Sequence, residues 1–405
     1  MAQVSLFEHE LDPGEVLKLI AGAKLCLLKF LSANDLGLTG SHQAGIYLSA
    51  QSWRFFLDGP GHETQNQEQT VRVDWGDGAS EGCFKWYASV REYRLTRVRD
   101  YFRNHEDEFL GALFLLLGGE DQREVSARVI TDEQTIEQVL NFFGITPADT
   151  GGLLDFDLDE RLRPECEAYL KETGAVFPDS DHLSRRAQRI FEQLYETGRS
   201  SIARPPADPD DAIVRLVEIE YALFRFLEHE IYRGHLATPF GDVTELLGVA
   251  LEIINRRKSR AGRSLENHLA YIFDRFGLSY GTNEITEGRK RPDFLFPGIN
   301  EYHDPTFPTD RLLCLGAKTT CKDRWRQVLS EADRLGTIHL FTLQQGISSA
   351  QLEEMHGAGV VPVIPADFHK LCRPEDRSRL LDLRSFLELA LERNGRRSEL
   401  PFGSP

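Results

Sequence analysis

The chain has 405 residues, of which 41% are hydrophobic and 27% are charged. This balance is typical of a globular protein with two domains of ordinary size and excludes a disordered chain. The longest apolar stretch, FLGALFLLLGG at 109–119, is shorter than the roughly 20 residues of a membrane-spanning helix, and the acidic start lacks a secretion signal. The cysteines have neither metal-site nor disulfide spacing, so we expect a protein of the reducing cytoplasm, away from membranes. They are Cys26, Cys83, Cys166, Cys314, Cys321 and Cys372.

The net charge of -17 argues against a generally basic, phosphate-binding surface. The charge is unevenly distributed, however. Residues 255–340 hold 15 Lys and Arg against 11 Asp and Glu, an excess of four positive charges, which leaves -21 for the rest. A locally basic part is therefore compatible with nucleic-acid binding.

The N-terminal half begins with a predicted helix over 13–22, followed by a strand that starts LCLLKFLSAN at 25–34. From there to about residue 145, short apolar runs alternate with glycine, asparagine and aspartate turns. We predict a compact, mostly antiparallel β-barrel or sandwich, with a helix at 132–143 capped by Thr131. Its runs are HQAGIYLSA, TVRVDWGDG, GCFKWYASV and EVSARVIT.

The clearest break in the chain is SSIARPPADPDDA at 200–212, where adjacent prolines can continue neither a helix nor a central strand. Helices are expected on both sides of it, at 182–197 and 211–232. We therefore predict a first domain at 1–175, a linker region at 176–212 and a second domain at 213–405.

The second domain alternates predicted helices and strands, which indicates α/β layers around a partly parallel sheet. The helices are expected at 242–257, 264–276, 323–335 and 348–357. The strands are expected at 292–297, 312–319, 337–343 and 360–364.

Two polar residues lie at the ends of neighbouring predicted strands: Asp293 in RPDFLFP and Lys318 in LCLGAKTTCKDRW. Hydrolysis of a phosphodiester needs carboxylates to hold divalent metal and a cation to stabilise charge. The pair resembles the PD-(D/E)xK nuclease pattern, although the acid expected two places before the lysine is Gly316.

A carboxylate from elsewhere must then complete the set. Glu331 on the predicted helix at 323–335 shares a face with Arg324 and Gln327, and Glu266 on an earlier helix is a further candidate. The alternatives stay open at this point: Asp293 as a solvated strand-start residue, and Glu331 as an exposed helix acid.

The surrounding sequence resembles the catalytic domain of the EcoRII family of restriction endonucleases, strongly over about 250–370. The matching segments, in order, are RRKSRAGRSLENHL, ITEGRKRPDFLFP, YHDPTFP, KTTCKDRWRQVLSEADR and HLFTLQQG. The resemblance implies that Asp293 and Glu331 bind Mg²⁺, that Lys318 is catalytic, and that Tyr302 belongs to the active site. It also implies that the segment Lys322, Asp323 and Arg324 reads CC/GG pairs, a role for which the chemistry of these side chains is suited.

The N-terminal half is less similar to the effector domain of the same family, a DNA-binding pseudobarrel. LSANDLGLTGSHQAGIYL and EYRLTR carry this resemblance, while Tyr93 stands where the family has a basic residue. It implies that five residues bind a second copy of DNA: His42, Tyr47, Glu92, Arg94 and Arg97.

We therefore expect a two-domain α+β and α/β chain: an N-terminal β-pseudobarrel that binds DNA and a C-terminal restriction-endonuclease-like domain. The expected activity is cleavage of both strands of double-stranded DNA at a CC/GG-containing, CCWGG-like site by a homodimer, controlled by the effector domain. A cognate DNA methyltransferase would be its genetic partner. The alternatives are a DNA-binding regulator with an inactive nuclease fold and a mismatch-repair nicking endonuclease.

Overall fold

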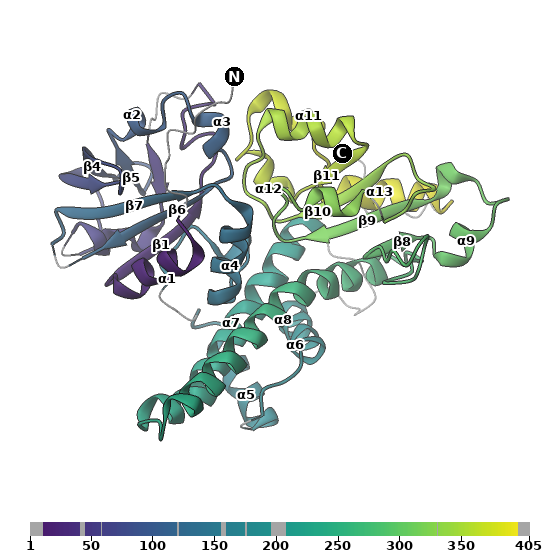
Figure 1. Cartoon of the computed structure of the whole chain (residues 1–405), viewed down its shortest axis with the longest axis horizontal. Coiled ribbons are helices and arrows are strands. Elements are labelled where there is room, and N and C mark those ends of the chain that lie inside the picture. Colours follow the sequence, from purple (N-terminus) through teal and green to yellow (C-terminus); the bar gives the residue numbers. More distant parts are fainter. Residues whose placement is uncertain are drawn as a thin grey trace.

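The computed structural model describes residues 11–40, 45–57, 59–119, 121–154, 159–174, 176–195, 208–329 and 331–395 (Figure 1). Within these ranges no helix is both long and apolar enough to cross a membrane.

The N-terminal half is built on a curled seven-stranded sheet in the order β1-β6-β7-β3-β4-β5-β2. Neighbouring strands are antiparallel except β3 and β7, which run parallel. The expected mostly antiparallel β-domain is confirmed. Its strands are β1 (Leu25–Phe30), β2 (Ile46–Leu48), β3 (Gln67–Asp74), β4 (Ala79–Tyr87), β5 (Glu92–Thr96), β6 (Leu113–Gly118) and β7 (Glu124–Ile130).

Strands β1 and β6 are apolar throughout because both of their faces are covered. One face lines the interior of the curled sheet, and the other packs against helices α1 (Pro13–Gly22) and α4 (Glu133–Phe143). Both helices were predicted. The Thr131 cap was wrong: Asp132 is the N-cap of α4, and its carboxylate accepts a hydrogen bond of 2.6 Å from the backbone of Thr135.

A group of helices connects the two halves: α5 (Arg163–Thr173), α6 (Ser180–Tyr195), α7 (Pro209–Ala237) and α8 (Val243–Arg275). Their apolar faces share one core with the C-terminal sheet. The helices predicted at 182–197 and 211–232 are confirmed as α6 and α7.

The break predicted between helices at 242–257 and 264–276 was wrong, because α8 is a single helix of 33 residues. The intervening residues are held by tertiary contacts that outweigh the low helix propensity of Gly262. Arg257 pairs with Glu228 at 2.7 Å, and Arg260 is buried and donates to Gly144 O.

The C-terminal half contains a four-stranded sheet in the order β11-β10-β9-β8, in which β9, β10 and β11 are parallel and β8 is antiparallel. The predicted partly parallel α/β sheet is confirmed. The strands are β8 (Phe294–Phe296), β9 (Leu313–Lys318), β10 (Ile338–Thr342) and β11 (Val360–Val363), with longer helices α11 (Ser349–Gly357) and α13 (Leu383–Arg393).

The helix predicted at 323–335 was wrong in its extent, since α10 covers only Trp325–Val328. Glu331 therefore lies beyond the helix rather than on its face. The other short helices are α2 (Arg99–Phe102), α3 (Glu106–Phe109), α9 (Ile299–His303), α12 (Ala366–His369), η1 (Ala50–Phe55), η2 (Pro147–Asp149), η3 (Thr309–Arg311) and η4 (Pro374–Arg379).

The curled sheet lies directly beside the C-terminal domain (Figure 1). Backbone groups approach each other at this contact: a Cβ added at Gly111 would lie 2.3 Å from the carbonyl oxygen of Gly346. Gln344 Nε2 donates to Gly111 O at 3.0 Å, and Ala33 N donates to Leu371 O at 2.9 Å. The two halves therefore form a close interface.

Candidate active site

Asp293 and Lys318 meet at one edge of the C-terminal sheet, as predicted for neighbouring strands. The register of β8 and β9 pairs Phe294 with Leu315, so Asp293 lies beside the end of β9. Asp293 Oδ2 accepts hydrogen bonds from Ala317 N at 2.7 Å and from Lys318 Nζ at 2.8 Å. This ion pair explains how a lysine can end an apolar, buried strand.

Glu331 belongs to the same cluster. Burial raises its pKa to about 7, and the negative charges of Asp293 and Glu266 add to the shift while Lys318 opposes it. Burial and the charge of Asp293 likewise raise the pKa of Glu266. Asp293, Glu266, Glu331 and Lys318 therefore lie close enough for their charges to interact. We call these four residues the active-site cluster.

Gly316 explains how Glu331 can take the place of the missing acid. A Cβ added at Gly316 would lie 3.7 Å from Glu331 Oε2 and 2.6 Å from Val328 Cγ1. The carboxylate of Glu331 therefore reaches the position on β9 where a nuclease of this pattern carries its second acid. Its Oε2 is buried and has no hydrogen-bond partner among the residues that the structure describes, so a cation or a proton is needed there.

Tyr302 lies near this cluster in sequence but contacts different residues. Its hydroxyl donates to Glu287 Oε1 at 2.7 Å and accepts from the backbone of Arg334 at 3.1 Å. Among the residues that the structure describes, no hydrogen bond or ion pair joins Tyr302 to Asp293, Lys318 or Glu331. Tyr302 instead supports the segment that carries Glu331.

The segment 322–324 is covered by helix α4 of the N-terminal domain. Glu133 Oε2 accepts hydrogen bonds from the backbone amides of Asp323 and Arg324, the latter at 3.0 Å. Arg324 pairs with Glu137 at 3.1 Å, and Lys322 Nζ donates to Thr131 O at 2.6 Å. Burial lowers the pKa of Lys322 and raises that of Glu133. Glu133 and Glu137 could not be identified from the sequence, because nothing local marks a helix terminus as the partner of a loop 190 residues away.

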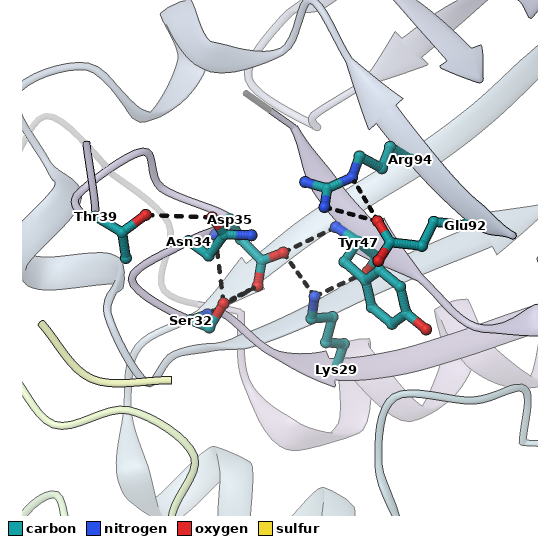
Figure 2. Close-up of polar contacts among 8 residues, drawn as sticks. All are labelled: Lys29, Ser32, Asn34, Asp35, Thr39, Tyr47, Glu92 and Arg94. Carbon is teal, nitrogen blue, oxygen red and sulfur yellow. Dashed lines mark hydrogen bonds and ion pairs between the residues drawn. The ribbon is translucent and has the colours of Figure 1, made fainter. Parts of the chain in front are cut away.

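Three of the remaining candidates, Tyr47, Glu92 and Arg94, lie on β2 and β5 of the curled sheet (Figure 2). Tyr47 stands opposite Arg94 in the strand pairing and is 42% exposed, whereas Arg94 is buried and pairs with Glu92 at 2.8 Å. Arg97 is exposed at the end of β5, has a φ of 62° and pairs with Glu81 at 3.5 Å. His42 lies outside the described residues.

A buried ion pair that the sequence does not reveal supports this surface. Lys29 Nζ contacts Asp35 Oδ1 at 2.6 Å and donates to the carbonyl of Tyr47 at 2.8 Å, while the amide of Tyr47 donates to Asp35 at 2.8 Å (Figure 2). Burial lowers the pKa of Lys29. The loop after β1 is therefore anchored to the strand that carries Tyr47.

Two family models match the chain: the C-terminal domain of EcoRII over 224–387 and the N-terminal domain of restriction endonuclease EcoRII over 22–149. The type II restriction enzyme EcoRII of Escherichia coli is 34% identical over 381 residues, which cover 89% of this chain and 92% of that protein. The chain belongs to the EcoRII family of type II restriction endonucleases. It is thus a site-specific deoxyribonuclease that acts on double-stranded DNA.

Three further proteins match less of the chain. The type II restriction enzyme SsoII of Shigella sonnei is 26% identical over 159 residues, covering 37% of this chain and 51% of that enzyme. Among solved structures, metal-depleted Ecl18kI in complex with uncleaved, modified DNA covers 61% of this chain and 89% of its own, at a TM-score of 0.45 and 20% identity. The complex of restriction endonuclease PspGI with substrate DNA covers 55% of this chain and 94% of its own. Its TM-score is 0.41 and its sequence identity is 12%.

Proposed function

We propose that this EcoRII-family chain is a magnesium-dependent homodimer that cleaves both strands of DNA at a CC/GG-containing, CCWGG-like site. The observation that carries the proposal is the active-site cluster, in which Asp293, Lys318 and Glu331 converge at one sheet edge. The match of the chain to both EcoRII family models supports the assignment of this cluster to DNA cleavage.

The donor set of the cluster fits a hard divalent cation. Asp293 and Glu331 offer carboxylate oxygens, and the buried Oε2 of Glu331 has no hydrogen-bond partner within the described ranges. In the described parts of the chain, no three His, Cys, Asp or Glu side chains are arranged to hold a metal. The other ligand positions would therefore go to water and to DNA phosphate, as is usual for Mg²⁺. Bound Mg²⁺ would neutralise phosphate charge and make a water more acidic.

The protein side chains would position the reaction. Lys318, held by Asp293, would place its ammonium charge against the phosphate as the water oxygen bonds to phosphorus and one phosphorus–oxygen ester bond breaks. Glu266 would approach the same site from α8. Tyr302 would hold the segment of Glu331 in place through Glu287 and Arg334.

Recognition would fall to Lys322, Asp323 and Arg324. Arg and Lys can donate to guanine O6 and N7, and Asp can accept from cytosine N4. In this structure, Glu133 accepts from the backbone amides of Asp323 and Arg324, Glu137 pairs with the Arg324 side chain, and Thr131 O accepts from Lys322 Nζ. We infer that the N-terminal domain inhibits cleavage by covering the reader segment.

Relief of this inhibition would come from a second DNA copy bound on β2 and β5. Tyr47, Glu92, Arg94 and Arg97 are the described candidates, and His42 is the fifth. A cognate methyltransferase would protect the host DNA in the cytoplasm, where we place the enzyme.

The first test is digestion of unmethylated plasmid with Mg²⁺, followed by sequencing of the fragment ends. We expect discrete double-strand cuts that share a CC/GG motif, and a loss of at least 100-fold in rate for Lys318→Ala. A protein that binds DNA but never cuts, even with added site-bearing oligonucleotides, would be the inactive regulator. A protein that nicks only one strand at mismatches would be the repair enzyme.

A further inference from the structure

The hairpin between α7 and α8 projects away from both domains (Figure 1). Residues 233–239 at the end of α7 and 241–248 at the start of α8 are exposed throughout. We call residues 233–255 the arm. Among the described residues of one chain, the outer half of the arm has no neighbour besides its own two helical ends (Figure 1), although short isolated helices are marginally stable in water.

The exposed side chains of the arm are unusually apolar. They leave roughly 500 Å² of apolar surface in water, at the upper end of the largest patch on a typical monomer. Such a patch marks an interaction site rather than chance exposure. Its members are Leu236 (76% exposed), Val243 (70%), Leu246 (44%), Leu247 (55%) and Leu251 (58%).

The charge of the arm excludes DNA as its partner. The arm has one basic residue, Arg233, which pairs with Glu230, and its acids are Asp242, Glu245 and Glu252. A phosphate-binding surface needs cations. Depletion of charge around an apolar centre is instead typical of the core of a protein interface.

Gly248 gives an independent indication. It lies in the exposed middle of this helical stretch, where glycine is about 1 kcal/mol less favourable than alanine, and a Cβ added there would meet nothing within 4 Å. Within the monomer nothing requires a glycine. A second helix crossing at this point would benefit from the close backbone approach that glycine permits.

We propose that the arm is the dimer interface, on which a second copy of this chain packs its own arm around a two-fold axis near Gly248. The inference rests on the proposed homodimer and names its surface. Two copies of the patch would bury about 1,000 Å², the lower bound for a specific interface. A self-complementary patch suits the isologous contact of a two-fold dimer.

The arm also connects to the active site through a single element. Gly248 and Glu266 both lie on α8, 18 residues and therefore about 27 Å apart. If two copies cross near Gly248 at the common angle of about 50°, the two Glu266 residues would stand roughly 23 Å apart. This separation suits two active sites that act on opposite strands of one duplex.

Light scattering on the full chain without DNA tests the interface. We expect the wild type at twice the 46.0 kDa of one chain and the double variant Leu247→Glu/Leu251→Glu at the monomer mass. The matched control is Val90→Glu/Val176→Glu, which changes two exposed valines away from the arm and should stay dimeric. A monomeric wild type, with and without DNA, would overturn the proposal, as would a dimeric arm variant.

Cross-linking gives a test that does not depend on disrupting the fold. All six native cysteines are buried, so Gly248→Cys introduces an exposed thiol near the proposed axis. Mild oxidation should yield a covalent dimer on a non-reducing gel, whereas Val90→Cys should not. Absence of the Gly248→Cys cross-link in a dimeric protein would place the interface elsewhere.

Plasmid cleavage separates this inference from the proposed function. The monomeric arm variant should form nicked circles and at least tenfold less linear product than the wild type. If Gly248→Cys is cross-linked through the arm but the wild type never cuts DNA, the interface stands and the function fails. If the arm variant cuts both strands as a dimer, the function stands and the interface is wrong.

Discussion

Glu331 lies in surroundings that disfavour its negatively charged form. Its carboxyl group is buried next to Asp293 and Glu266, and no described residue forms a hydrogen bond with one of its oxygens. Such an arrangement is costly in the absence of a ligand and becomes favourable when a cation binds. If this cluster is the active site, as we propose, it is built at the expense of the stability of the free protein.

The raised pKa of Glu331 predicts how stability varies with pH. The pKa of Glu331 is 4.5 in the unfolded chain and about 7 in the folded protein. Folding therefore favours the protonated form, and the stability that this form contributes is lost as the pH rises from 4.5 through 7. Glu331→Gln should thus raise Tm by a few degrees at pH 8 in metal-free buffer and leave it unchanged at pH 4.

Thermal denaturation at both pH values checks this expectation. Glu375→Gln, an exposed acid of η4, is the control and should change Tm at neither pH. Mg²⁺ should stabilise the wild type at pH 8 but not Glu331→Gln. An equal Tm for wild type and Glu331→Gln at pH 8 would contradict the assigned electrostatics.

For single residues, the sequence was a better guide to which side chains form the candidate site than to the contacts that hold them. Asp293 and Lys318 could be paired from strand ends alone, and Glu331 was selected as the replacement acid. Its supposed place on a helix face was wrong, because the chain leaves the helix after Val328 and is held by Thr286, which donates to Glu331 O at 2.7 Å. Tertiary hydrogen bonds of this kind leave no periodic pattern in a sequence.

Helix α4 is the element on which the proposed inhibition depends. Its first turn presents Glu133 to the backbone of the reader segment 322–324, and its second turn presents Glu137 to Arg324. A hydrogen bond to a charged group contributes about 1.5–3 kcal/mol. One side chain could therefore account for much of the closed state.

Glu133→Ala should release the reader segment. We expect the rate of cleavage of DNA with a single site to rise about tenfold or more, since 1.4 kcal/mol corresponds to a factor of ten. The measurement is the initial rate with and without an activating oligonucleotide, which should stimulate the variant less than the wild type. Glu124→Ala, on β7 and away from the reader segment, serves as control. An unchanged single-site rate in Glu133→Ala would refute inhibition through α4.

Most elements could be predicted from periodicity, but two could not be delimited. The polar segment around Gly262 suggested a helix break, yet Arg257 and Arg260 bind groups from other elements and hold α8 continuous. Conversely, the helical pattern after Asp323 is interrupted because Arg334 donates to several carbonyls, among them Asp304 O at 2.9 Å. In both cases the deciding contacts lie far away in sequence.

Across the whole molecule, the two halves touch through backbone as well as side chains. Gly111 has a φ of 76° and lies against Gly346 with no room for a Cβ. Composition and motifs reveal the two folds separately, but not which surfaces meet. The boundaries 1–175, 176–212 and 213–405 accordingly remain a prediction.

Gly111→Ala should separate the domains at this contact. The added methyl group would come 2.3 Å from Gly346 O, so we expect faster hydrogen exchange at 111–113 and 344–346 and faster single-site cleavage. Gly151→Ala is a suitable control, because Gly151 also has a positive φ (99°) but open space around its Cβ. If Gly111→Ala and Gly151→Ala changed hydrogen exchange and single-site cleavage equally, backbone strain alone would explain the changes and the domain contact would not be involved.

The length and continuity of α8 have a consequence for how such enzymes can change. One rigid rod bears the arm at its start, the contacts with the N-terminal domain at Arg257 and Arg260, and Glu266 one and a half turns later. Inserting a single residue after Glu252 would rotate the arm by about 100° relative to the active site, while seven residues would restore the orientation and add about 10 Å. The length of α8 would thus set the distance between the cuts in the two DNA strands, in steps of whole helical turns. A relative with a different distance between its cuts could therefore arise by a length change in this one helix, without any change in its catalytic residues.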